Sequence, residues 1–363
     1  MNPLLQIRAL GQQIWLDNLS RSLLNDGHLT RHIAEDGIAG VTTNPAIFQK
    51  AIAGGRYYGE DLARLKKQPF TPEARYEQLA VADVRRACDL LRPLFEQSRG
   101  EAGYVSLEVS PALAHNAEGT LAAGKRLYAE VDRANLLIKV PATPAGLEAV
   151  ERLLGEGINV NVTLLFSLAQ VEATATAYLR GLERLRTAGG DTGRAMSVAS
   201  LFLSRVDTLV DARLEKIGGE ALALRGQAAV ALARLAYQNY RERFHSPAFA
   251  GARPQYLLWA STGTKNPAYS DLLYVEPLIG AGTVTTLPDA TLAALRDHGR
   301  VTETLTRKSD IASARELFAR LTALGIDLDE IGETLQTDGL TQFEQAFAKL
   351  LELTADQGDA GLS

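Results

Sequence analysis

Two ionisable side chains lie inside short apolar runs, and they are the groups in this sequence best suited to chemistry. Lys139 interrupts the run 136–140, and Glu108 interrupts the run 104–109. Burying a charged ammonium among aliphatic side chains is costly, so such a position favours the neutral amine that attacks a ketone to form a Schiff base. A lysine at a strand end can instead extend its ammonium to a carboxylate. The strand alone leaves both interpretations open.

Other polar residues end or interrupt similar runs. Asp17 ends one apolar run, and Asn161 and Thr163 alternate within another. If the second run is a strand of a barrel, its period of two turns both side chains inward. Asp17 or its neighbour Asn18 could instead cap the next helix. A carboxylate within a strand, such as Glu108, needs a partner or a function.

Taken together, these groups suit imine chemistry on a polyhydroxylated carbonyl compound. A lysine can form the covalent adduct, carboxylates can move protons, and amides can hold hydroxyl groups. No cofactor fingerprint accompanies them, so we expect neither a metal nor an organic cofactor. His28 and His32 lack the intervening glutamate of a zinc-protease motif, and the Gly-Ala-Gly at 280–282 does not lead into a helix.

The elements that must position these groups alternate between strand and helix. Runs rich in β-branched and aliphatic residues lie at 14–17, 40–43, 104–109, 136–140, 160–166, 195–202, 255–260 and 274–279. Segments of helical period lie between them, at 19–35, 72–96, 119–131, 146–155, 169–186 and 206–243. Continuous apolar runs are typical of parallel strands covered on both faces. Eight of them predict an α/β fold, a single (β/α)8 TIM barrel, because the competing doubly wound sheet usually has five or six strands.

The ends of four runs carry a second signal for this fold. Each of the following dipeptides comes after an apolar run and before an expected helix: Asn44-Pro45, Ser110-Pro111, Thr143-Pro144 and Asn266-Pro267. A polar N-cap followed by proline at the first helical position is a strong helix start. The pattern places polar residues at the carboxyl ends of the strands, where barrel enzymes have their active sites. Asn44 would serve as a cap whether or not it also binds a ligand.

Two segments exceed a minimal barrel. Residues 48–99 connect the second and third strands with more helix than one crossover needs, and 289–353 adds about three helices after the last strand. We expect one catalytic domain over 1–355 and a flexible tail over 356–363.

Composition excludes several classes of protein. The 363 residues include 38 Lys+Arg and 43 Asp+Glu, a net charge of −5, which argues against a nucleic-acid or anionic-membrane binder. The longest uncharged stretch, 157–171, is too short to span a bilayer. The single cysteine, Cys88, excludes an intrachain disulfide. We expect a soluble cytoplasmic protein, either a monomer or a homodimer.

Four segments in matching order give the sequence a resemblance to the transaldolase family. They are IWLDNLSR at 14–21, GVTTNP at 40–45, LIKVPAT at 137–143 and NVNVTLLFS at 159–167. The stretch from 324 to 343 resembles the longer bacterial branch of that family. The resemblance covers nearly the whole chain, from 14 to 353.

The resemblance implies roles for the chemical groups. Lys139 would be the Schiff-base nucleophile, and Asp17 the acid and base at the C4 hydroxyl of the ketose. Glu108 would act as acid and base through a water near Thr163.

The resemblance also implies a substrate-binding set. Asn44, Asn161 and Ser200 would hold hydroxyls of a bound dihydroxyacetone unit. Arg205 matches the phosphate-binding arginine of the family, and Lys265 stands where other branches have a second arginine. A lysine there keeps the charge but loses the bidentate fork; the alternative is a solvated loop lysine.

The implied reaction transfers a dihydroxyacetone unit between sedoheptulose 7-phosphate/glyceraldehyde 3-phosphate and erythrose 4-phosphate/fructose 6-phosphate, a step of the pentose phosphate pathway. The partners would be sugar phosphates, with no nucleic acid and no membrane. One alternative is a class I aldolase, a lyase that releases dihydroxyacetone from fructose 6-phosphate. The other is a barrel that binds sugar phosphates without turnover. Phe202 favours transfer, because the related aldolases have a tyrosine there.

Overall fold

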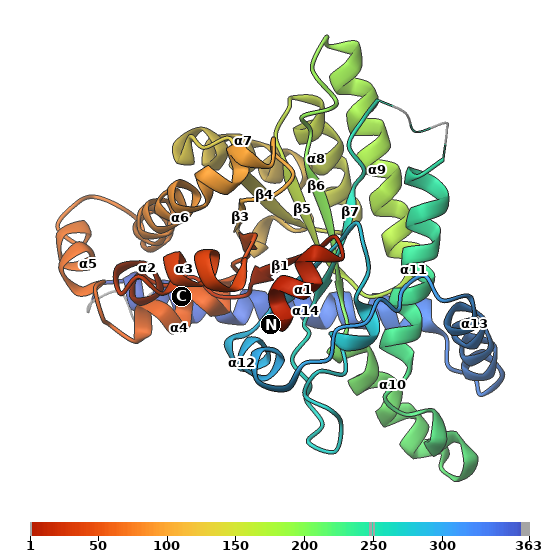
Figure 1. Ribbon diagram of the computed structural model, residues 1–363. Coiled ribbons are helices and arrows are strands. Elements are labelled where there is room, and N and C mark those ends of the chain that lie inside the picture. Colours follow the sequence, from red (N-terminus) through yellow and green to blue (C-terminus); the bar gives the residue numbers. More distant parts are fainter. Residues whose placement is uncertain (1, 247–248, 250, 357–363) are drawn as a thin grey trace.

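Eight parallel strands close into a barrel in the computed structural model, which describes residues 2–246, 249 and 251–356 (Figure 1). Each strand pairs with the next along the chain, and β8 pairs with β1 to close the ring. The strands are β1 (Gln12–Leu16), β2 (Gly40–Val41), β3 (Tyr104–Glu108), β4 (Leu136–Pro141), β5 (Val160–Leu165), β6 (Ser197–Phe202), β7 (Tyr256–Ala260) and β8 (Thr283–Leu287). The predicted (β/α)8 TIM barrel is confirmed.

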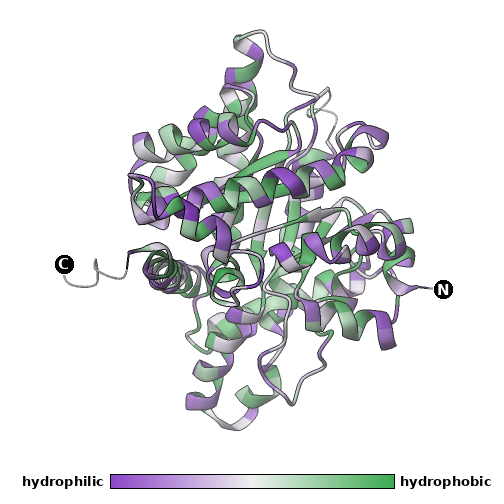
Figure 2. Cartoon of the chain, turned by 90° about the vertical axis from the view of Figure 1, so that its left-hand side faces the viewer, coloured by the Kyte–Doolittle hydropathy of each residue, from purple (hydrophilic) through white to green (hydrophobic). Residues whose placement is uncertain are grey.

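Helices surround the strands and bury them on their outer side. The helices are α1 (Pro3–Ala9), α2 (Arg21–Asn25), α3 (His28–Arg31), α4 (Pro45–Ala53), α5 (Gly59–Leu65), α6 (Pro72–Gln97), α7 (Ala117–Val131), α8 (Pro144–Gly155), α9 (Leu168–Thr187), α10 (Ser204–Ile217), α11 (Ala228–Phe244), α12 (Asp289–His298), α13 (Lys308–Ala323) and α14 (Leu328–Thr354). Every residue of β3, β4, β5 and β6 is buried, which explains why these strands read as continuous apolar runs. Figure 2 shows both hydropathy colours on the outer helices, as amphipathic covers require. Among the described residues, no helix combines the length and the apolar character needed to cross a bilayer.

Two segments of helical period are each interrupted by left-handed glycine. The segment 19–35 breaks at Gly27, whose φ is 73°, and continues through α3 into a π-helical turn at His32–Asp36. The segment 206–243 divides into α10 and α11, because Gly218 at φ 72° ends the first helix. The apolar period was correct in both segments, but positive φ is incompatible with a continuous α-helix.

The eighth strand was assigned to the wrong segment. Residues 274–279 form a loop with one 3₁₀ turn at Glu276–Leu278, and the strand is β8, nine residues later. Pro277 lacks the amide proton that a central strand needs. The run is apolar because the loop is buried: Leu278 and Ile279 have no exposed surface. The true strand is rich in threonine, a β-branched residue that suits a strand but reads as polar.

The four proline junctions do not all begin helices. Asn44 and Thr143 cap α4 and α8, accepting backbone N–H bonds of 3.0 and 2.9 Å. Ser110 precedes a single 3₁₀ turn and makes no side-chain cap. Asn266 caps only a turn, where its Oδ1 accepts from the Ala268 N–H at 3.0 Å. The prediction therefore holds for the first and third junctions and is wrong for the second and fourth, at which no α-helix follows.

The extra helices were predicted correctly at both places. α4 and α5 precede the long α6 between β2 and β3, and α12, α13 and α14 follow β8. The long α14 crosses the molecule in Figure 1 and is seen nearly end-on beside the C-terminus in Figure 2. Of the expected tail 356–363, Asp356 forms an ion pair with Arg75 at 2.8 Å, and the rest lies outside the described residues.

α14 packs against the carboxyl ends of the strands. Gln336 Nε2 donates to the carbonyl oxygens of Leu164 and Ala142, at 3.0 and 3.2 Å. Gly332 permits this approach, because a Cβ there would lie 2.6 Å from the Cβ of Ser167. The last long helix thus covers the end of the barrel at which the predicted site lies.

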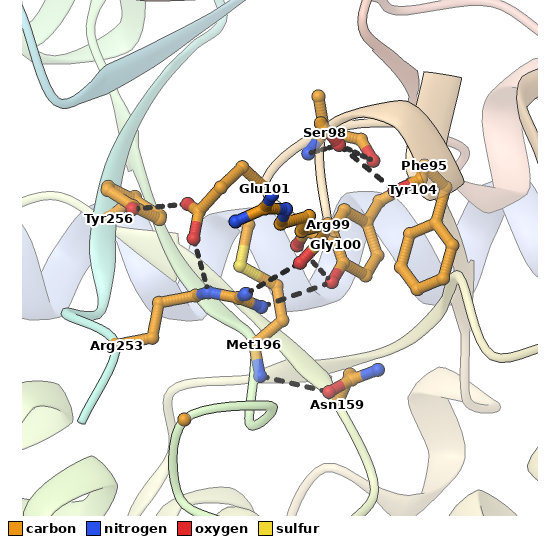
Figure 3. A network of polar contacts seen from close by, with 12 residues as sticks. Phe95, Ser98, Arg99, Gly100, Glu101, Tyr104, Asn159, Met196, Arg253 and Tyr256 are labelled. Carbon is orange, nitrogen blue, oxygen red and sulfur yellow. Dashed lines mark hydrogen bonds and ion pairs between the residues drawn. The ribbon is translucent and has the colours of Figure 1, made fainter. Parts of the chain in front are cut away.

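Polar contacts tie together the loops at the opposite, amino-terminal end (Figure 3). Arg253 Nε donates to Glu101 at 2.9 Å, and Tyr256 Oη donates to the other oxygen of the same carboxylate at 2.7 Å. Tyr104 Oη donates to the Gly100 carbonyl at 2.7 Å. A cavity of about 670 Å³ lies among these loops, and none of the predicted site residues lines it.

Candidate active site

A cavity of about 190 Å³ opens at the carboxyl end of the barrel. The predicted site residues that line it are Asp17, Asn44, Lys139, Thr163, Ser200, Arg205 and Lys265. Glu108 and Asn161 are absent from that lining; both are buried and contact residues that line it. The structure therefore brings the predicted set together around one site, although this cavity is much smaller than the one at the amino-terminal end.

Lys139 lies in β4 and is only 4% exposed. Its Nζ donates to the Thr43 carbonyl at 2.8 Å and lies 3.3 Å from Glu108 Oε2. The register of β3 and β4 sets this second contact, since Glu108 and Lys139 are paired positions. The amine therefore points into the barrel. The alternative of a lysine that extends to a carboxylate is met in part: Lys139 does lie beside a carboxylate, but Glu108 is buried as well, so the amine does not reach the surface.

Glu108 is an acid of the site whose pKa lies well above its ordinary value. Burial raises its pKa to about 7, and the nearby Asp17 adds to the shift, while Lys139 opposes it. Neither carboxylate oxygen has a hydrogen-bond partner within the described part of the chain, and the same is true of the Thr163 hydroxyl. A group with a pKa near neutrality can both give and take a proton at physiological pH.

This pKa predicts a pH-dependent stability. Because the folded-state pKa lies above the ordinary value of 4.5, Glu108 stabilises the fold below that value and loses this contribution as the pH rises through about 7. Between pH 5 and pH 8, the free energy of unfolding of the unchanged protein should fall by about 2 to 3 kcal/mol more than that of the Glu108→Gln variant. Urea unfolding at a series of pH values measures the difference. The control is Glu333→Gln, an exposed change on α14, whose free energy of unfolding should vary with pH as that of the unchanged protein does. If the free energy of unfolding of Glu108→Gln also varies in this way, Glu108 does not titrate in this range.

Asp17 directly follows β1 and is half-buried at the cavity wall. Burial raises its pKa, and Lys139 opposes the shift. It does not cap the next helix, because Ser20 accepts the N–H of Leu23 at 3.1 Å. Asn18 is also no cap, since its amide donates to Asp289 at 2.9 Å. Among the described residues, the Asp17 carboxylate makes no hydrogen bond or ion pair, which leaves it available to a ligand.

The amides differ in their availability. Asn161 is fully buried; its Nδ2 donates to Ser106 Oγ at 3.0 Å, and its Oδ1 accepts from Ser200 Oγ at 2.7 Å. These bonds cross the barrel interior, so the predicted inward orientation of the Asn161 side chain is confirmed. Asn44 uses Oδ1 as a helix cap at Ile47, which leaves its Nδ2 group at the cavity. Capping and ligand binding are thus compatible at that residue.

A bulge in β5 shapes the wall beside Thr163. The register between β5 and β6 shifts between Val162 and Leu165, and Leu164 has a φ of 61°. A left-handed non-glycine residue is strained and needs compensating contacts. Gln336 from α14 supplies one by binding the Leu164 carbonyl.

Sequence reasoning missed the contribution of α14 to the site. Phe343 lines the cavity, with its ring centroid 5.8 Å from Lys139 Nζ. Nothing local to Phe343 distinguishes it from an ordinary core residue of an amphipathic helix. It lies more than 200 positions after Lys139 in the chain, so only the packing of α14 across the barrel reveals its place.

Two cationic side chains line another part of the cavity. Arg205 lies in the first turn of α10, and its buried Nη1 has no hydrogen-bond partner among the described residues. Burial lowers the pKa of its guanidinium, and Asp338 on α14 opposes that shift. Gly339 of α14 packs beside the guanidinium, since a Cβ there would lie 3.4 Å from Nη1, an ordinary van der Waals contact. Lys265 is exposed in the loop after β7 but borders the same cavity.

The arrangement defines a class of enzyme. A buried lysine amine lies beside a carboxyl group of near-neutral pKa, and a second carboxylate lines the same cavity at the carboxyl ends of barrel strands. Arg205 and Lys265, which make no hydrogen bond or ion pair with other described residues, suit a phosphorylated substrate. Fold and site together are those of a Schiff-base enzyme that makes or breaks carbon–carbon bonds.

Comparison with known proteins identifies the family. Residues 14–354 match the family model described as transaldolase/fructose-6-phosphate aldolase. The chain is 57% identical over 357 residues to a transaldolase of Thiobacillus denitrificans, an alignment covering 97% of this chain and 99% of the relative. Transaldolases of Neisseria gonorrhoeae and Mycolicibacterium smegmatis are 51% and 48% identical, covering 97% and 99% of this chain and 99% and 98% of theirs. The chain belongs to the transaldolase/fructose-6-phosphate aldolase family, and these full-length relatives support a transaldolase function and a transferase class, as the sequence motifs predicted.

Proposed function

We propose that this chain transfers a dihydroxyacetone unit between sugar phosphates: from sedoheptulose 7-phosphate to glyceraldehyde 3-phosphate, giving erythrose 4-phosphate and fructose 6-phosphate, and in reverse. The observation that carries the proposal is the buried amine of Lys139, 3.3 Å from a carboxyl group and bordering a polar cavity at the carboxyl end of the barrel. The buried, unpaired Cys88 agrees with a reducing compartment, and we assign the reaction to the cytoplasm.

The first half-reaction forms the imine. The neutral amine of Lys139 adds to the C2 carbonyl of the ketose phosphate. Glu108 protonates the resulting C2 hydroxyl through a water held with Thr163, and water leaves as the protonated imine forms. A pKa near 7 suits Glu108 to this role, because the protonated form is present at neutral pH.

Cleavage and transfer follow on the same lysine. Asp17 removes the proton of the C4 hydroxyl, C4 becomes an aldehyde carbon, and the electron pair of the C3–C4 bond moves to the imine. The aldose phosphate leaves, and the three-carbon enamine stays on Lys139, with its hydroxyls held by Asn44 and Ser200, and with Ser200 oriented by its bond to Asn161. C3 of the enamine then attacks the aldehyde of the acceptor, Asp17 returns the proton to the new hydroxyl, and hydrolysis of the imine frees the product.

Enclosure of the enamine favours transfer over release. Phe202 and Phe343 line the cavity, and α14 packs across its end. Water must be kept from the enamine until an acceptor arrives. The aldolase alternative is separated by product analysis: a transferase stalls without an acceptor aldehyde, whereas a lyase continues to release dihydroxyacetone. A barrel that only binds sugar phosphates would form no imine at all.

The phosphate site is tested by Arg205→Ala. Loss of a charge-assisted contact should raise the KM for fructose 6-phosphate about 10- to 100-fold and leave the kcat/KM for unphosphorylated fructose nearly unchanged. Both donors are assayed with unphosphorylated glyceraldehyde as acceptor. Arg213→Ala is the matched control, since Arg213 lies farther along α10 in an ion pair with Glu330 and not in the cavity. Equal losses for both donors would assign the phosphate to another place.

A further inference from the structure

Two phenol–carboxylate pairs join α10 to the loop that carries Lys265. Tyr274 Oη donates to Asp207 Oδ2 at 3.0 Å, and Tyr269 Oη donates to Asp211 Oδ2 at 2.7 Å. The two aspartates are four positions apart and therefore lie on one face of α10. Both are buried, with 1% and 8% of their surface exposed.

The same helix contacts the start of that loop. Ser204 Oγ and Ser261 Oγ are 2.8 Å apart, and the Ser204 N–H donates to the Ser261 carbonyl at 3.1 Å. We call residues 261–275 the cation loop. Arg205 is the residue after Ser204, so the helix that carries one cation is bonded to the loop that carries the other.

The aspartates are themselves fixed from a third side. Asp207 Oδ1 accepts from the Ala229 N–H at 2.8 Å, and Asp211 Oδ1 accepts from the Gly226 N–H at 2.9 Å. Gly226 also makes room for the Tyr269 ring, because a Cβ there would lie 2.9 Å from Cζ. Because these backbone bonds hold the carboxylates in place, the carboxylates cannot move with the tyrosines. The positions of the tyrosine hydroxyls are therefore set by α10 and by residues 226–229 at the start of α11.

Lys265 lies in the cation loop that these bonds hold against α10. Within the described chain it makes no hydrogen bond or ion pair of its own. It borders the active-site cavity on one side and a second cavity of about 220 Å³ on the other, which Asp207 and Asp211 line. With open space on both sides, no hydrogen bond or ion pair with a described residue holds the Lys265 side chain, and the backbone of the cation loop sets the region that its amino group can reach.

We propose that Asp207 and Asp211, through Tyr274 and Tyr269, are positioning residues that fix Lys265 relative to Arg205 and thereby set the affinity for the substrate phosphate. This inference rests on the proposed function, in which Arg205 binds that phosphate. Neither the aspartates nor the tyrosines touch the sugar; they act through the placement of the cation loop.

The test compares Tyr269→Phe, Tyr274→Phe and the double variant, which keep the rings and remove only the hydroxyls. The double variant should raise the KM for fructose 6-phosphate about 5- to 30-fold, with kcat held within about twofold, and each single variant should give a smaller rise. The kcat/KM for unphosphorylated fructose, with glyceraldehyde as acceptor, should stay unchanged. Tyr256→Phe is the matched control, because it also removes a phenol–carboxylate bond, at the far end of β7, and should change neither donor.

A thermal unfolding midpoint for each variant checks that the fold is retained. If the folded double variant binds fructose 6-phosphate as before, or loses both donors equally, the inference is overturned. Arg205→Ala in the same assay separates the two ideas. If Arg205→Ala impairs the use of fructose 6-phosphate but not of fructose, and the tyrosine variants show no such difference, only the positioning role fails. If Arg205→Ala does not discriminate either, the phosphate site of the proposed function fails as well.

Discussion

Lys139→Met should lower kcat for transfer from fructose 6-phosphate by about 10⁴-fold or more, because the variant lacks the buried amine that forms the imine, and Lys265, a second lysine at the cavity, lies in the exposed loop after β7. Methionine keeps the length and apolar stem of the side chain, so the barrel should still fold. The loss of Lys139 as the partner of Glu108 is tolerable, since that carboxyl group has a pKa of about 7 and is uncharged at lower pH. Stopped-flow or coupled assays measure kcat, and equilibrium dialysis measures binding of the sugar phosphate.

The control is Lys265→Met, a like change at a lysine that borders the same cavity. It should weaken phosphate binding while leaving imine formation intact. Substantial turnover by a folded Lys139→Met variant would contradict the mechanism, because the covalent adduct would then form elsewhere. Loss of folding would be detected separately by circular dichroism.

Asp17→Ala should block cleavage while sparing the imine. Removal of a general acid and base typically lowers the rate by about 10²–10⁴-fold. The ketose should still condense with Lys139, because Glu108, and not Asp17, serves the dehydration step. Single-turnover experiments with fructose 6-phosphate should therefore accumulate an adduct that releases aldose phosphate slowly.

Asp289→Ala provides the comparison for Asp17→Ala. Asp289 lies close enough to raise the pKa of Asp17, yet it bonds Asn18 and does not line the cavity. We expect its replacement to change the cleavage rate by less than about threefold, the size of a weak exposed electrostatic contact. Normal cleavage by the Asp17 variant would remove that residue from the proton-transfer role.

Most of the barrel could be predicted from the sequence because parallel strands covered on both faces have a distinctive composition. β3, β4, β5 and β6 are uninterrupted buried segments, and their apolar runs were unambiguous. β8 could not be recognised in the same way. Its buried threonines resemble a polar loop in the sequence, while a truly buried loop nearby resembles a strand. Apolar content reports burial, and only the ladder of hydrogen bonds separates a strand from a buried loop.

The candidate site was predictable where its residues lie at strand ends. Lys139 and Glu108 could be singled out because charged groups are rare within apolar strands, and the β3–β4 register then places them side by side. Phe343 and the Tyr269–Asp211 anchor could not be found in this way. They depend on how α14 and the cation loop pack against the barrel, and such long-range contacts leave no local pattern.

The most direct measurement of the central claim is the mass of the protein after borohydride reduction in the presence of fructose 6-phosphate without an acceptor. The account predicts that the three-carbon enamine, in equilibrium with its imine, is reduced to a stable dihydroxyacetone adduct, and that peptide mapping locates this adduct on Lys139 alone. An adduct on any other residue, or no adduct at all from a folded and substrate-saturated protein, would contradict it.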